Sequence, residues 1–197
     1  ILAHLHRRKS VIVAEDGRQQ IVTFGTVSPE QAFVTFSSVC FSAFVLFFAD
    51  YLADLRAGRV TADQQAAFAQ AVSLLTPPPS APPELQRGPF TSETQVIAAM
   101  IEAGRHTVGY RLVDSYFGNI SCRLGDTVYI SQTGSSLDDL AGCIDPCPLD
   151  GSSCAGITAS SELTAHTDIY LRTGNQTILH GHPPFAVILS MDCEERD

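Results

Sequence analysis

Hydrophobic positions in the second half of the chain change between helical spacing and the alternation typical of strands. The pattern predicts a helix that starts at Thr91 or Ser92 and ends near Gly104, two strands within 117–134, a helix over 160–174, a strand over 176–182 and a helix over 183–191. Alternation around Gly125-Asp126 marks the turn between the two strands. A loop rich in Asp, Gly, Pro and Cys is expected before the second helix, whose N-cap is Ser160 or Ser161. This order predicts a mixed α/β domain.

The first half of the chain has a different pattern. Residues 10–25 predict a hairpin that turns at Asp16-Gly17. A strongly apolar helix follows Ser28, which begins a capping box with Pro29 at the first helical position. A second capping box at Thr61 predicts another helix. The sequence thus predicts an extra hairpin and two helices ahead of the α/β domain.

A proline-rich run, Thr76 to Glu84, separates the two halves and favours a stiff extended form. We therefore expect three parts: an N-terminal region over 1–75, a linker over 76–90 and the α/β domain over 91–197.

The apolar segment over 32–49 has the length of a short membrane span. Its four hydroxyl side chains, its lack of flanking Lys or Arg and its continuation into Asp50 favour a helix buried inside a soluble protein. We expect no membrane partner.

Composition narrows the class of partner. The chain has 12 Lys plus Arg against 21 Asp plus Glu, a net charge of −9, which argues against a nucleic-acid surface. Its six cysteines match no common zinc spacing and indicate reduced thiols in a cytoplasmic protein. A small anionic substrate is still compatible with this negative net charge, because one local site can be positive in an acidic protein.

His180 and His182 are the first candidates for chemistry. They end the expected strand over 176–182, so alternation points both side chains to the same face, with Gly181 between them. Two imidazoles are too few for a zinc site, which normally takes three protein ligands in an enzyme.

Glu162 is the natural third member, in the first turn of the expected helix. Its simplest role there is electrostatic, since a carboxylate suits a helix N-terminus. Near a metal it could be a ligand, a general base, or both in turn. Three pairs of residues at turns or helix starts could surround an anion: Gly118-Asn119, Thr133-Gly134 and Ser160-Ser161.

Four motifs in order, "GNISCR", "ISQTG", "SSELTAHTDIY" and "ILHGHPPFAVILS", resemble the class II aldolase/adducin family over residues 92–192. The family includes sugar-phosphate aldolases, epimerases and dehydratases. The resemblance implies a central, mostly antiparallel sheet flanked by helices, zinc or another divalent metal as cofactor, a phosphorylated sugar as substrate, and a homotetramer.

The resemblance also implies roles for individual residues. Those implied to bind the substrate phosphate are Gly118, Asn119, Thr133, Gly134, Ser160 and Ser161. Glu162 corresponds to the catalytic acid/base, and His180 and His182 correspond to two zinc ligands. His166 corresponds to a recurrent histidine, for which we expect packing or support of the site rather than ligation. Glutamate at 162 favours the aldolase branch, since the epimerase branch usually has aspartate.

The chain departs from the family at its C-terminal end. The family's third histidine ligand and its tyrosine proton donor would lie beyond His182, where only fifteen residues follow and none is histidine. We expect a C-terminally incomplete domain. The prediction is a zinc-dependent aldolase cleaving a ketose 1-phosphate. Alternatives are an epimerase or dehydratase of the same family, a non-catalytic adducin-like module, and a separate partner-binding role for residues 1–75.

Overall fold

A computed structural model describes residues 8–114, 116–152, 157–191 and 193. Contacts divide the chain into two compact units, one formed by residues 1–75 with 184–197 and the other by residues 76–183. The division of the chain into three parts stays a prediction.

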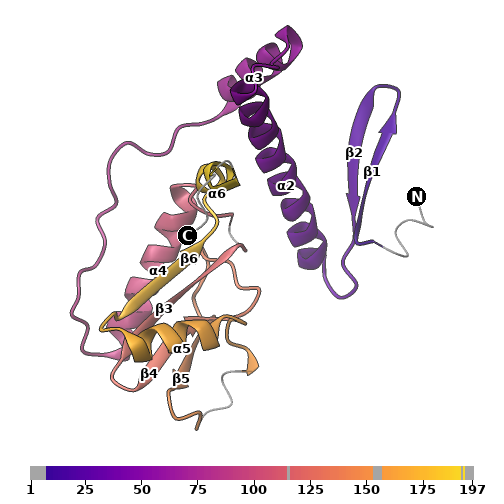
Figure 1. Ribbon diagram of the computed structural model, residues 1–197. Helices are drawn as coiled ribbons and strands as arrows, with labels where there is room; N and C mark the ends of the chain where they lie inside the picture. Colours follow the sequence, from indigo (N-terminus) through magenta and orange to yellow (C-terminus); the bar gives the residue numbers. More distant parts are fainter. Residues whose placement is uncertain (1–7, 115, 153–156, 192, 194–197) are drawn as a thin grey trace. The chain divides into compact units, whose positions relative to one another are not determined.

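The second unit contains a sheet with strand order β5-β4-β3-β6, all neighbours antiparallel (Figure 1). Its strands are β3 (Gly118–Leu124), β4 (Thr127–Ser131), β5 (Ile144–Pro148) and β6 (Thr177–Gly181). Its helices are α4 (Glu93–Gly109) and α5 (Leu163–Arg172). The predicted mixed fold with an antiparallel sheet and flanking helices is confirmed.

The two helices of this unit cover opposite faces of the sheet. Ile120 of β3 packs in one core cluster with Met100 of α4, and Ile130 of β4 packs in another with Tyr170 of α5. Alternation explains the division, because Ser121 pairs with Ile130 in the β3–β4 register and therefore shares its face. The β3 face toward α5 thus carries polar side chains, and the face toward α4 carries apolar ones.

Strand β5 corrects the expectation of an irregular loop after β4. Its sequence, Ile144 to Pro148, contains two prolines, which usually argue against a strand. The strand lies at the edge of the sheet, where a missing N–H costs no ladder bond on the open side. Sequence pattern cannot reveal which strand takes an edge.

Two helix boundaries also differ from the expectation. Helix α4 continues past Gly104 to Gly109, because Gly104 is buried against the Leu137 backbone rather than ending the helix. Helix α5 has Glu162 itself as N-cap, without a side-chain capping bond. The Ser160 hydroxyl instead accepts a hydrogen bond from the Glu162 N–H at 3.3 Å. Glu162 therefore lies just before the helix and not in its first turn.

The described residues of the first unit form a hairpin and three helices. Its elements are β1 (Ser10–Glu15), β2 (Arg18–Thr23), α2 (Pro29–Arg56), α3 (Ala62–Leu74) and α6 (Pro184–Met191). Ser28 caps α2, and Thr61 forms the predicted capping box of α3. Ile188 of α6 is buried with Val45 and Phe48 of α2.

Helix α2 is long and apolar enough to cross a membrane, and among the described residues it is the single such helix. Only 11% of an 18-residue apolar stretch of this helix is buried. Val45 and Phe48 are its buried residues, and the rest of the helix is part-buried or exposed, so the structure does not show the buried helix that was expected. Phe33 and Phe36 in the N-terminal half are exposed.

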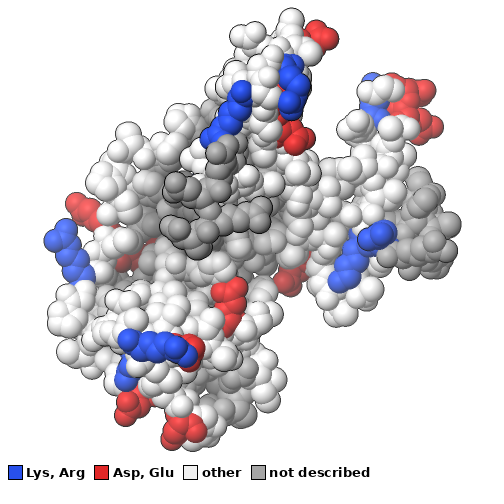
Figure 2. All heavy atoms as spheres, viewed as in Figure 1, with Lys and Arg blue, Asp and Glu red and all other residues white. Residues whose placement is uncertain are grey.

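The charged side chains and the cysteines are distributed as follows. On the face seen in Figure 2, the described Lys and Arg side chains lie scattered among Asp and Glu and form no basic patch. Cys40, Cys122, Cys143 and Cys147 are free thiols. Cys154 lies outside the described residues.

Candidate active site

The site begins where β3 and β6 pair. Asn119 and His180 are partners in the antiparallel register, so their side chains leave the same face of the sheet, the one that α5 covers. The Asn119 Nδ2 lies 3.4 Å from Nδ1 of His180. Two segments 61 residues apart in sequence thus bring an amide and an imidazole together.

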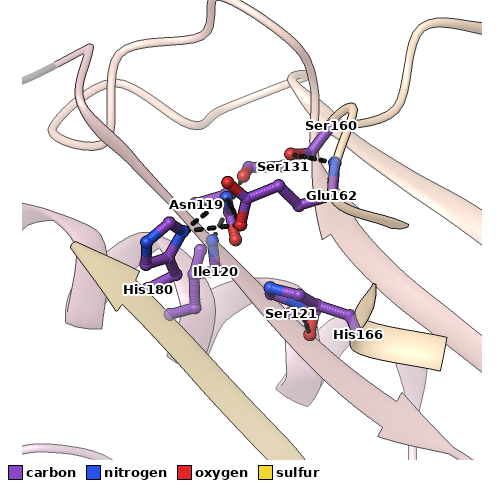
Figure 3. A network of polar contacts seen from close by, with 8 residues as sticks. All are labelled: Asn119, Ile120, Ser121, Ser131, Ser160, Glu162, His166 and His180. Atoms are coloured by element: carbon purple, nitrogen blue, oxygen red, sulfur yellow. Dashed lines mark hydrogen bonds and ion pairs between the residues drawn. The ribbon is translucent and has the colours of Figure 1, made fainter. Parts of the chain in front are cut away.

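Glu162 completes this contact from the start of α5. Its Oε2 lies 2.6 Å from His180 Nδ1 and accepts a hydrogen bond from Asn119 Nδ2 at 3.1 Å (Figure 3). The amide of Asn119, followed by the nearby His180, lowers the pKa of the Glu162 carboxyl against an opposing effect of burial. The carboxyl group is therefore ionised at neutral pH and can accept a proton.

His182 lies just beyond the end of β6. Its ring meets that of His180 edge to face, with centroids 4.9 Å apart. The two imidazoles therefore adjoin each other, as the strand alternation predicts. Among the described residues, no three or more His, Cys, Asp or Glu side chains gather closely enough to enclose a metal ion.

A hollow of about 240 Å³ opens over these groups. All nine residues assigned to the site from sequence line it: Gly118, Asn119, Thr133, Gly134, Ser160, Ser161, Glu162, His180 and His182. Tyr116, Phe117 and Gln132 line it as well and were not expected. The structure thus brings the whole predicted set to one place, while the roles of its members stay predictions.

Several of the expected phosphate-binding groups already have partners in this structure. Thr133 donates its N–H to Thr158 O at 2.9 Å and its hydroxyl to Ala159 O at 2.8 Å. Asn119 donates to Glu162, while its buried Oδ1 has no partner among the described residues. The Ser160 hydroxyl accepts from the Glu162 N–H, and a hydroxyl that accepts one hydrogen bond can also donate one. For Thr133 and Asn119 to bind an anion, they would have to exchange their present partners.

A buried polar chain lies beside the site on the same sheet face. The Ser121 hydroxyl lies 2.7 Å from His166 Nδ1 and 2.6 Å from the Tyr170 hydroxyl. Burial lowers the pKa of His166 and raises that of Tyr170 to about 12, so both side chains are neutral near pH 7. His166 is thus placed in the packed interior, as the sequence suggested. In the sequence, the polar Ser121 between the apolar Ile120 and Cys122 could have indicated a buried polar partner for His166.

Comparison with known proteins identifies the family. The model of the "Class II Aldolase and Adducin N-terminal domain" matches residues 98–196, half of the chain. The chain belongs to the class II aldolase/adducin family. The match begins inside α4 and takes in every residue that lines the hollow.

The chain is similar to a named enzyme and to a solved structure. A probable bifunctional methylthioribose-1-phosphate isomerase/methylthioribulose-1-phosphate dehydratase from Nocardia farcinica is 34% identical over 80 residues, covering 37% of this chain. The chain spans only 14% of that relative's length. The solved structure of L-fuculose-1-phosphate aldolase from Thermus thermophilus is 28% identical, with a TM-score of 0.47 over 51% of each chain.

Proposed function

We propose that this chain carries the active site of a metal-dependent lyase that cleaves a ketose 1-phosphate by a retro-aldol reaction. The observation that supports it most directly is the contact of Glu162 with His180, 2.6 Å apart, in a hollow also walled by turns suited to an anion. Membership of a family that includes lyases supports the reaction class.

The side chains of Glu162, His180 and His182 are of the chemical types that bind divalent cations. Imidazole and carboxylate are ordinary zinc ligands, and Glu162 already holds Nδ1 of His180, an arrangement that orients a ligating ring. His180 and His182 would hold the ion, with Glu162 as a third ligand or as the acid/base. When bound, the ion supplies Lewis-acid polarisation of substrate oxygens.

The protein's own groups account for proton transfer and positioning. Cleavage between C3 and C4 removes the proton of the C4 hydroxyl, turns C4 into the aldehyde carbon and leaves an electron pair on C3 beside the C2 carbonyl, which must then take up a proton. Because its pKa is lowered, Glu162 starts as the base: it accepts the C4 hydroxyl proton and afterwards returns it, as the acid, to C3. Ser160, Ser161, Gly134 and Gly118 bind the phosphate, which fixes the reacting carbons by remote binding.

The name of the Nocardia farcinica relative favours a second candidate, dehydration of a phosphorylated ketose. A dehydratase or an epimerase would use the same carboxylate and the same anion pocket, and would differ in the bond that breaks. A non-catalytic adducin-like module is disfavoured because Glu162, His180 and His182 adjoin in one hollow.

We further propose a cytoplasmic homo-oligomer, a tetramer, acting in carbohydrate metabolism. The free thiols and the absence of a basic patch on the viewed face support the compartment and a small-molecule substrate.

Metal analysis of the purified protein, followed by screening of ketose 1-phosphates for aldehyde release, tests the proposal. Bound divalent metal with cleavage of one of these substrates would support the aldolase. Bound metal with loss of water and no cleavage would establish the dehydratase instead. Absence of metal after preparation without chelators, together with no turnover, would favour the non-catalytic module.

A further inference from the structure

Asp145 is a buried carboxylate that lies outside the candidate site. It occupies the edge strand β5, opposite Ile130 in the β4–β5 register, and is 8% exposed. Among the described residues it forms no ion pair. A charge so placed must be held by hydrogen bonds, because its desolvation would otherwise be costly.

Both oxygens of this carboxylate accept hydrogen bonds from neutral side chains. Gln132 Nε2 donates to Oδ1 at 2.8 Å, and Thr158 Oγ1 donates to Oδ2 at 2.6 Å. A carboxylate only accepts, so it fixes the direction of both donors. Hydrogen bonds to a charged group are also roughly twice as strong as neutral ones.

The two donors belong to the two segments that form the anion end of the hollow. Gln132 follows β4 and directly precedes Thr133-Gly134, while Thr158 comes two residues before Ser160. The segments also join through the Gln132–Ala159 bridge and the bond from Thr133 N–H to Thr158 O. Gln132 lines the hollow as well. Asp145 thus links the two turns that are proposed to bind one anion.

We propose that Asp145 is the positioning residue of the anion pocket, holding the 132–134 and 158–161 segments at the spacing that one phosphate group requires. This inference rests on the proposed function, because it takes the phosphate of the substrate as the anion bound there. Asp145 acts through Gln132 and Thr158 and does not touch the substrate.

Inorganic phosphate is the probe that tests this role without turnover. Its dissociation constant is measured by calorimetry on the full chain for wild type, Asp145→Ala, Asp145→Asn and the exposed control Asp126→Ala. Loss of two charge-assisted bonds in Asp145→Ala should weaken phosphate about tenfold. Asparagine can accept from Gln132 and donate to the Thr158 hydroxyl, so Asp145→Asn should stay within about threefold of wild type. Asp126→Ala should bind as wild type does.

A kinetic comparison separates positioning from a general structural role. For the substrate identified by the screen, Asp145→Ala should raise KM about tenfold with a smaller change in kcat, and should leave cleavage of the unphosphorylated ketose unchanged. Equal losses on both substrates would overturn the inference, as would unchanged phosphate affinity in Asp145→Ala.

Two further outcomes are distinguishable. If Asp145→Ala does not fold, Thr158→Val removes one of the two bonds at an exposed position, and phosphate affinity equal to wild type in that variant would overturn the inference. Wild-type protein that binds no phosphate would instead overturn the anion pocket of the proposed function.

Discussion

Glu162 is the side chain on which the proposed chemistry depends. Glu162→Gln keeps its size and can still accept from Asn119, but it can no longer take up a proton. We expect turnover to be abolished while binding of inorganic phosphate is retained. Steady-state rates and calorimetry measure the two properties separately.

The matched control is Glu84→Gln, an exposed glutamate of the proline-rich segment, which should leave both properties unchanged. Turnover that survives in Glu162→Gln would reject the assigned role, and joint loss of turnover and phosphate binding would point to a distorted pocket instead.

His166 links the site to the stability of the sheet. Burial lowers its pKa from the ordinary value of 6.5, so the unfolded chain takes up a proton at a higher pH than the folded protein does. The free energy of unfolding should therefore fall as the pH drops from about 6.5 through the lower pKa of the folded state. His166→Gln, which can still form a hydrogen bond with Ser121, should flatten this dependence.

Amide hydrogen exchange of β3 at several pH values measures that effect within the sheet itself. Above pH 7, where the imidazole is neutral in both the folded and the unfolded state, the exchange protection of β3 should depend on pH in the same way in wild type and variant. If the exchange protection of β3 declines equally in both proteins between pH 6.5 and 5, His166 does not supply the pH dependence.

Helix α4 approaches the loop that follows β4 through a glycine. A Cβ atom added to Gly104 would lie 2.2 Å from the Leu137 carbonyl oxygen, a contact that only a backbone shift can relieve. Gly104→Ala should destabilise the unit by about 1–3 kcal/mol, although alanine is the better helix former. Thermal or denaturant unfolding measures the change.

Gly109, at the end of the same helix, provides the comparison, because a Cβ there would meet nothing within 4 Å. Gly109→Ala should be neutral or stabilising by up to about 1 kcal/mol. Equal stability of the two variants would mean that the loop yields easily and that the close approach is not required.

At the scale of the whole chain, helix α6 follows the second unit in sequence but belongs to the same compact unit as residues 1–75. Ile188 is 2% exposed in its packing with Val45 and Phe48. A fragment of residues 76–197 should therefore expose an apolar helix and bind a hydrophobic dye, whereas a fragment of residues 76–183 should bind less. Fluorescence titration of both fragments measures the difference, and equal binding would show that α6 finds other cover.

Local pattern was sufficient for the features that depend on neighbours in sequence. The side-chain hydroxyls at Ser28, Thr61 and Ser92 cap helices, because an N-cap needs only the next three residues. The closeness of the His180 and His182 rings, at the end of β6 and just beyond it, was expected from the two-residue period of a strand. For the same reason the β3–β4 hairpin could be predicted.

Tertiary structure decided everything that joins distant segments. The β3–β6 register, which sets Asn119 opposite His180, is fixed by the packing of whole faces and not by either strand alone. Only the fold shows that Glu162 contacts His180 and that the proline-containing β5 lies at a sheet edge. Only the fold shows, too, that Asp145 accepts hydrogen bonds from Gln132 and Thr158. The sequence by itself therefore determined which residues carry the chemistry, and the pairing of strands far apart in the chain decided which of them touch.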